Sequence, residues 1–204
     1  LERLAVTVFQ GTEDIPKDTE SAKVWESLGI SKARIAFLGM DDNFWAAGQT
    51  GPCGSDTEIF YWRSEEEVPT KFDPEDERWV EIWNNVFMEF NRDETGKITP
   101  LPKKNVDTGM GYERIVSVME GVNDNYESSI WKDVIELLES ITKLPYKENQ
   151  KSMRIIADHL RTSVFIAADP SGITPSNTDQ GYILRRLIRR AIRHAKKLNI
   201  DIDG

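Results

Sequence analysis

The sequence predicts an α+β fold, with strands in the first part of the chain and helices in the second. Short β-branched and aromatic runs recur up to about residue 101, whereas apolar residues beyond residue 128 are spaced three and four positions apart. Strands followed by helices are typical of an α+β core and a separate helical domain. We therefore expect a core over residues 1–125 and a helical domain over residues 126–204.

The first part holds short strand patterns separated by glycine and proline. Strands are expected at 4–9, 34–38, 58–62 and 97–101, with a short helix at 20–28. We expect a glycine-rich loop at 41–57 and an exposed, mobile loop at 65–77, which is acidic and contains two prolines. Residues 79–90 predict a strand with a bulge near Asn84 and Asn85.

The second part predicts three helices. Residues 130–141 and 151–168 are apolar-periodic and are separated by Pro145, and residues 169–172 end the second helix. Ser176 or Thr178 is expected to cap a last helix that ends near Leu198.

Composition excludes several classes of protein. The chain has 204 residues, 39% of them apolar and 30% charged, and no apolar run approaches the ~20 residues that cross a bilayer. Cys53 is the single cysteine, which excludes an internal disulfide and fits a reducing cytoplasm. The two histidines, His159 and His194, have no cysteine partners at metal-ligand spacing, so no zinc site is expected. A first residue of Leu1 suggests a piece of a longer protein.

Charge is distributed unevenly along the chain. Residues 1–150 carry 16 Lys and Arg against 30 Asp and Glu, and residues 151–204 carry 10 against 5. On the last helix, basic residues fall opposite the apolar face: Arg185, Arg186, Arg189, Arg190, Arg193, Lys196 and Lys197. Such a stripe favours RNA or phosphate contact, although a solvated face or a pairing with the acidic first domain remains open.

The stretch 105–114, NVDTGMGYER, carries the most chemical information. It predicts a strand, a glycine turn and a helix, in which Gly109 and Gly111 let the backbone approach a ligand. Asp107 offers an anion for an ammonium group, and Arg114 offers a forked cation for phosphate oxygens. This pair suits an enzyme that activates an amino acid with a nucleotide. An ordinary strand–helix corner with surface charges has the same spacing.

Several blocks in order give the chain a wider resemblance. They are DNFW at 42–45, TGPCG at 50–54, TEI at 57–59, EIWN at 81–84, VFM at 86–88, FNR at 90–92, the stretch 105–114, IIADHLR at 155–161, PSN at 175–177 and GYILRR at 181–186. In this order they resemble the alanyl-tRNA synthetases, a family of class II aminoacyl-tRNA synthetases, over almost the whole chain. The resemblance implies part of the class II antiparallel sheet with flanking helices, followed by part of a helical tRNA-binding domain.

The resemblance also implies two half-reactions and the residues that serve them. Alanine and ATP would form alanyl-adenylate and pyrophosphate, and alanine would then pass to the 3′ end of its tRNA. The alanine site would comprise Trp45, Asn84, Val86, Asp107 and Gly109, with Asp107 on the ammonium group and Gly109 keeping the pocket small. Gly111 and Arg114 would bind ATP, with Arg114 and Asp107 as the catalytic pair, and Glu58 would support the nucleotide or its Mg²⁺ ion. No general base on the protein is needed. The acceptor stem would meet Asp179 and the arginines of the last helix.

The chain differs from the family at two places, and it lacks two of the family's motifs. The family repeats Pro-Cys after Gly54, where this chain has Ser55 and Asp56, and many bacterial members have asparagine where Asp179 stands. Motifs 1 and 2, with an arginine that contacts the ATP α-phosphate, would lie in a segment upstream of Leu1, supplied in cis or in trans. We expect the chain alone to bind ATP and alanine weakly and to catalyse little. The alternatives are a non-catalytic RNA-binding module and a related enzyme for another small amino acid.

Overall fold

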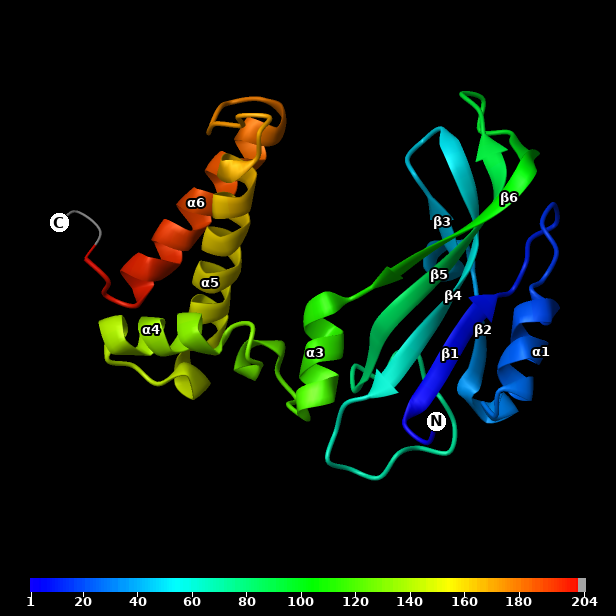
Figure 1. The fold of residues 1–204 in the computed structure, drawn as a ribbon, viewed down its shortest axis with the longest axis horizontal. Coiled ribbons are helices and arrows are strands. Elements are labelled where there is room, and N and C mark those ends of the chain that lie inside the picture. The colour runs from blue at the N-terminus through cyan, green and yellow to red at the C-terminus, as the bar shows by residue number, and fades with distance from the viewer. Residues whose placement is uncertain (202–204) are drawn as a thin grey trace. The chain divides into compact units, whose positions relative to one another are not determined.

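The computed structural model describes residues 1–201, and these form two compact units (Figure 1). The first unit is Leu1–Asn123, and the second begins at Asp124. The first contains a mixed sheet with three helices, and the second is helical, as expected for an α+β chain. None of the helices in residues 1–201 is long and apolar enough to cross a membrane.

One sheet organises the first unit. Its strands are β1 (Leu4–Phe9), β2 (Ile35–Leu38), β3 (Phe44–Ala46), β4 (Gly51–Trp62), β5 (Trp79–Arg92) and β6 (Ile98–Met110). The spatial order is β2-β1-β4-β5-β6, and β3 pairs with β4 at one end. Only β1 and β2 are parallel, because α1 (Thr19–Ser27) and the short η1 (Lys32–Arg34) connect them as a crossover.

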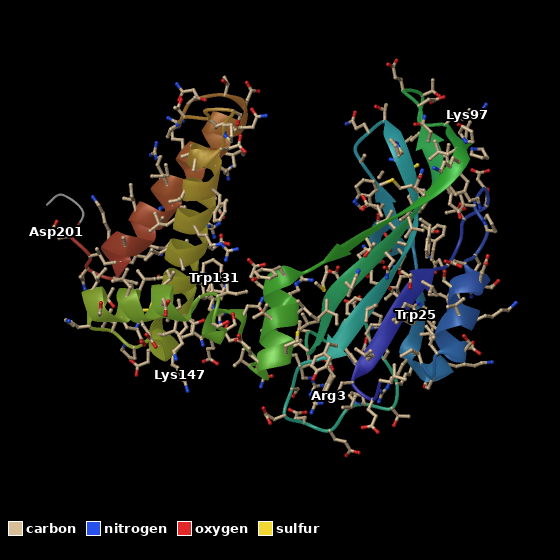
Figure 2. All side chains as sticks on the ribbon, in the orientation of Figure 1. Arg3, Trp25, Lys97, Trp131, Lys147 and Asp201 are labelled. Atoms are coloured by element: carbon tan, nitrogen blue, oxygen red, sulfur yellow. The ribbon has the colours of Figure 1, made fainter. Side chains whose placement is uncertain are left out.

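Helix α1 covers one face of this sheet. Asp18 caps it, since its side chain accepts a hydrogen bond of 2.9 Å from the backbone N–H of Ser21. Trp25 is directed toward the sheet and donates through Nε1 to Oγ1 of Thr57 at 2.8 Å (Figure 2). The helix is therefore attached by a polar contact as well as by its apolar side.

The expectation of a loop over 41–57 is wrong. This segment contains helix α2 (Met40–Asn43), strand β3 and the first half of β4. One of its glycines, Gly54, is required by strand pairing, because a Cβ there would lie 1.7 Å from the carbonyl oxygen of Phe87 on β5. The glycine permits close approach of two paired strands rather than a flexible loop.

Residues 65–77 contain no helix or strand, as expected, but they are not fully exposed. Phe72 is only 3% exposed and packs on Trp79 and Phe60, with ring centroids 5.3 Å and 5.2 Å apart. Trp62 and Val68 complete this cluster. Burial of this aromatic side chain attaches the segment to the sheet at one residue. Most of residues 65–77 are exposed, as expected, and the mobility of the segment stays a prediction.

Strand β5 is bulged, but not at Asn84 and Asn85. Those two residues pair regularly with Glu58 and Thr57, and the irregularities lie on either side, near Ile82 and near residues 87–89. Strand β6 extends through Met110, so Gly109 belongs to a strand, and only Gly111 lies at the turn into α3 (Tyr112–Glu120). Pairing with β5 overrides the local glycine signal.

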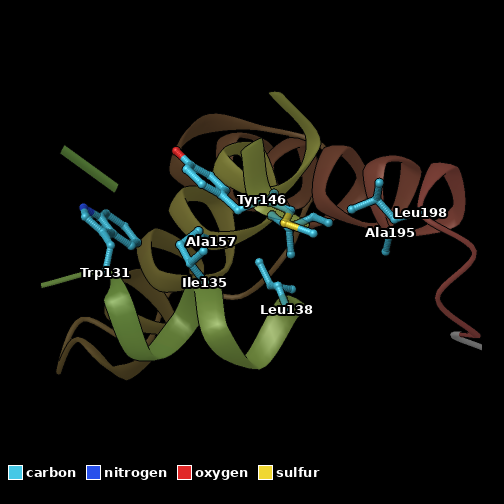
Figure 3. Close-up of a cluster of buried hydrophobic side chains, with 9 residues drawn as sticks. Trp131, Ile135, Leu138, Tyr146, Ala157, Ala195 and Leu198 are labelled. Atoms are coloured by element: carbon cyan, nitrogen blue, oxygen red, sulfur yellow. The ribbon is translucent and has the colours of Figure 1, made fainter. Parts of the chain in front are cut away.

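The second unit consists of η2 (Asn125–Glu127), α4 (Lys132–Thr142), α5 (Tyr146–Ala168) and α6 (Asp179–Lys197). Its core contains Trp131, Ile135, Leu138, Tyr146, Met153, Ile156, Ala157, Ala195 and Leu198 (Figure 3). Thr178 stands at the N-cap position of α6, although its side chain makes no capping hydrogen bond. The three long helices match the expected segments.

A polar cluster joins η2 to α5 beside that core. The hydroxyl of Tyr146 donates to Oδ2 of Asp124 at 2.5 Å, and Nη2 of Arg154 donates to the same oxygen at 2.6 Å. Arg154 Nε also donates to the Tyr146 hydroxyl at 2.8 Å. We call Asp124, Tyr146 and Arg154 the clamp of the second unit.

Candidate active site

The register of the sheet places most of the predicted site residues on one face. Across β4, β5 and β6 there are two rows of directly paired residues, and we call each row a rung. They are Asp56–Val86–Asp107 and Glu58–Asn84–Gly109. Residues directly opposite one another in an antiparallel pair project to the same side, and so do residues two apart on one strand. These six residues therefore share one side of the sheet, which we call the site face.

A bulge adds a seventh residue to this face. Glu58 pairs with Asn84, but Phe60 pairs with Glu81, so β5 holds one extra residue between the two pairs. The shift brings Glu81 to the side of Phe60 and Glu58. Without the bulge, simple alternation from Asn84 would have turned Glu81 away.

Glu81 holds the predicted phosphate-binding arginine. Nη1 of Arg114 lies 2.8 Å from Oε2 of Glu81 and 2.7 Å from its backbone carbonyl oxygen. Asp107 on β6 and Arg114 on α3 therefore lie on the same side of the sheet. Asp107 is exposed, and Arg114 is paired rather than an isolated cation.

The two glycines of the 105–114 stretch have different surroundings. A Cβ at Gly109 would meet no atom within 4 Å, so the space above this part of the site face is open. A Cβ at Gly111 would lie 3.0 Å from Cδ of Arg114. Gly111 thus lets the arginine side chain fold back over the turn toward Glu81.

Trp45 reaches the same side from β3. It lies opposite Gly54, two residues before Asp56 on β4, and its side chain remains 37% exposed. An exposed tryptophan beside polar residues is available for contact with a ligand.

Two carboxyl groups lie on the site face away from full contact with water: Asp56 is buried and Glu58 is half-buried. Burial raises the pKa of Asp56 to about 6, although hydrogen bonds from Asn43 and Asn84 oppose the shift. Burial, followed by the negative charges of Glu81 and Asp56, raises the pKa of Glu58 to about 7. Sequence reasoning missed Asp56 as a site residue. Its position two residues before Glu58 in a strand was the available signal.

A large cavity lies on the other side of the sheet. Its volume is about 760 Å³, and its lining includes Trp25 of α1, Thr57, Asn85 and Phe87. None of the predicted site residues lines it. The polar residues of the site face and this cavity are therefore on opposite faces of the sheet.

Neither metal-ligand geometry nor thiol chemistry is evident in residues 1–201. No three His, Cys, Asp or Glu side chains in this range are grouped so that they could hold a metal ion. Cys53 is buried in β4, and burial raises the pKa of its thiol. A thiol with a raised pKa is a poor nucleophile.

The second unit carries the predicted basic helix. Arg186, Arg189, Arg190 and Arg193 are exposed on α6, opposite the buried Leu184, Ala191 and Ala195. Arg185 differs: it is half-buried and its Nε is shielded, because it lies at the flank of the helix, about 100° from Leu184.

An aromatic ring accompanies the arginines at the start of α6. The Cζ atoms of Arg185 and Arg186 lie 5.7 Å and 5.6 Å from the ring centroid of Tyr182, which is 39% exposed. Asp179, the first residue of the helix, is exposed and adopts a φ of 49°. Sequence reasoning overlooked Tyr182, although an aromatic residue among arginines is a common feature of RNA-binding surfaces.

Comparison with known proteins identifies relatives over almost the whole chain. The family described as tRNA synthetases class II (A) matches residues 1–203. The chain is 49% identical to an alanine–tRNA ligase of Treponema denticola and 48% identical to one of Borrelia hermsii, over 98% of its length in each case. An alanine–tRNA ligase of Nitrosococcus oceani is 45% identical over the same share. The chain spans about a third of the Treponema and Borrelia relatives, 34% and 35%.

Proposed function

The chain belongs to the family of tRNA synthetases class II (A), and from that premise we propose that it is part of an alanine–tRNA ligase. The enzyme would join alanine to ATP as alanyl-adenylate, with release of pyrophosphate, and then transfer alanine to the 3′ end of tRNA(Ala). The site face would serve the first half-reaction, and α6 would serve the second. ATP with Mg²⁺ is a substrate in this scheme.

The alanine pocket would lie over the rungs of the site face. Asp107 would hold the α-ammonium group, since its carboxylate is exposed on the side to which Val86 projects. The open space above Gly109 leaves room for the small substrate, and a larger residue at 109 would fill it. Trp45 and Asn84 would complete the walls.

Arg114 and Gly111 would bind ATP at the start of α3. Both hydrogen bonds of the guanidinium use Nη1, and within residues 1–201 the edge formed by Nε and Nη2 has no partner. That edge could take two phosphate oxygens in a forked geometry and stabilise the charge that develops as pyrophosphate leaves. Glu58, in the rung with Asn84 and Gly109, would support the nucleotide from the sheet.

The tRNA acceptor stem would bind along α6. Exposed arginines at 186, 189, 190 and 193 supply cations for backbone phosphates, and Arg185 would contribute from the flank. Asp179 at the start of the helix would accept a base amino proton.

Strand β6 would take a further strand from the rest of the protein. It ends the sheet, spans 13 residues, and every residue from 102 to 110 is exposed. A long edge with unpaired backbone groups is a template for strand addition. A segment with motifs 1 and 2 would complete the sheet and provide a second arginine for ATP.

The observation that carries the proposal is the convergence of Asp107 and Arg114 on one sheet face. The test is alanine-dependent ATP–pyrophosphate exchange by the longer protein that contains this chain, or by the chain complemented with the missing segment. We expect exchange with alanine and much less with serine or glycine. Exchange with serine or glycine alone would favour a related enzyme for another amino acid.

A non-catalytic RNA-binding module is the second candidate, and the exposed arginines of α6 are the observation that favours it. It predicts tRNA binding without exchange under any complementation. Measuring both properties on the same protein separates the two candidates.

A further inference from the structure

A chain of hydrogen bonds connects Asp56 to Glu58 by way of two other elements. The side-chain nitrogen of Asn43 on α2 donates to Oδ1 of Asp56 at 2.8 Å and to Oγ1 of Thr7 on β1 at 2.8 Å. Thr7 then donates to Oε2 of Glu58 at 3.1 Å. Asn43 and Thr7 are completely buried, and Asp56 is 2% exposed. We call these four residues the relay.

With Glu58 ionised, the donors and acceptors of the relay admit one direction. The Asn43 amide nitrogen has two hydrogens, and Asp56 and Thr7 take one each. Because the Thr7 oxygen accepts from Asn43, its single hydrogen remains for Glu58. Asp56 thus holds the amide, the amide orients the hydroxyl, and the hydroxyl holds the carboxyl group of Glu58.

The second oxygen of Glu58 is held only loosely. Asn84 donates to Oε1 at 3.4 Å, near the limit of a useful hydrogen bond. The other charged groups near Glu58 are Glu81, Asp56 and Asp42, which repel its charge. Thr7 is therefore the main contact that fixes the direction of the carboxyl group.

We propose that Asp56 is a positioning residue that, through Asn43 and Thr7, fixes the direction of the Glu58 carboxyl group on the site face. The relay itself depends on geometry alone, and only its effect on catalysis rests on the proposed function.

The first test measures the side-chain conformation of Glu58 in the 204-residue chain. Three-bond couplings on glutamate-labelled protein report whether one rotamer or several are populated. Asp56→Ala removes the acceptor and Thr7→Val removes the hydroxyl at nearly constant shape. We expect several rotamers in both variants, and one rotamer in the native protein, in Asp56→Asn and in Thr7→Ser.

The matched control is Asp42→Asn, which removes a nearby negative charge without touching the relay. We expect it to keep a single Glu58 rotamer. If Glu58 stays fixed in Thr7→Val while the backbone amide spectrum shows the native fold, the proposal is overturned. Thr7→Val decides the question alone if Asp56→Ala does not fold.

The second test uses a double-mutant cycle in the longer protein. We expect Asp56→Ala to lower the exchange rate about tenfold to a hundredfold, as for a misplaced contact. In a Glu58→Ala background it should have no further effect, because the two residues act as one unit. An equal loss in both backgrounds would show a merely structural role for Asp56. Absence of exchange in the native protein would overturn the proposed function, while the rotamer test would still decide the relay.

Discussion

Arg114 on α3 is fastened to Glu81 on β5 by two contacts from one nitrogen, 2.8 Å to the carboxylate and 2.7 Å to the backbone carbonyl. The pair is partly exposed, with 43% of the arginine side chain and 35% of the glutamate side chain accessible. Glu81 therefore directs the guanidinium over the site face and keeps its other edge available for an anion.

Replacing Arg114 should separate binding from stability. We expect Arg114→Ala to raise the KM for ATP in exchange by about tenfold or more, as for a lost charge-assisted contact. The melting temperature should change little, because exposed ion pairs contribute about 0–1 kcal/mol. Arg78→Ala, which also removes an ion-paired arginine, is the control and should leave the KM unchanged. A large loss of stability with normal ATP affinity would assign Arg114 a structural role.

Removing the carboxylate of Asp107 should abolish alanine-dependent exchange without unfolding the protein. The side chain is exposed on β6, so Asp107→Ala leaves no buried cavity. The control is Asn105→Ala, two residues earlier on the same side of the strand. Exchange rates and far-UV circular dichroism measure the two properties. Unchanged exchange in Asp107→Ala would contradict its assignment to the alanine ammonium group.

The raised pKa values of Asp56 and Glu58 should make the first unit less stable as pH rises. A carboxyl group whose folded pKa is raised favours the folded state below its ordinary pKa, near 4, and this contribution is lost as pH rises toward 6 for Asp56 and 7 for Glu58. We expect Glu58→Gln to stabilise the protein by about 1–2 kcal/mol at pH 8, after allowance for solvent screening. Urea unfolding at pH 5 and pH 8 measures the difference. Exposed Glu67→Gln controls for the loss of one negative charge, and an equal gain in both variants would argue against burial as the cause.

Charge reversal on α6 should weaken RNA binding. We expect Arg190→Glu with Arg193→Glu to lower affinity for a tRNA acceptor-stem helix about tenfold or more, and to reduce the salt dependence by about one unit of slope per residue. Fluorescence anisotropy across a salt series measures both. The pair Lys132→Glu and Lys147→Glu, also exposed on the second unit, makes the same charge change elsewhere. Equal losses in both pairs would point to net charge rather than a defined surface.

The clamp should account for acid sensitivity of the second unit. Burial alone would raise the pKa of Asp124, but hydrogen bonds from Tyr146, the backbone and Arg154 outweigh it and lower the pKa overall. The resulting stabilisation is present above the ordinary pKa near 4 and is lost as pH falls below it. Arg154→Met should cost about 1–3 kcal/mol at pH 7 and less at pH 3, as measured by urea unfolding. Lys132→Met, which removes an exposed pair, should cost far less, and an equal cost would contradict the clamp.

Local chemistry in the sequence determined much of the architecture. The β-branched and aromatic run of β1, the apolar residues of one parity in β5, the apolar period of α4 and α6, and the turn at Gly96 each predict an element from its immediate neighbours. The basic face of α6 follows from the 100° spacing of its arginines. The candidate residues Asp107 and Arg114 were also recognisable, because their chemical types and spacing are local properties.

Only the tertiary structure decided how those residues meet. Strand pairing turned the glycine-rich segment around Gly54 into β4, since a close approach of backbones and a flexible loop use the same residue type. A bulge in β5 brought Glu81 to the site face and gave Arg114 its partner, and burial against Asn43 made Asp56 part of the site. Register, bulges and burial depend on contacts between segments far apart in the chain, which periodicity within one segment does not encode.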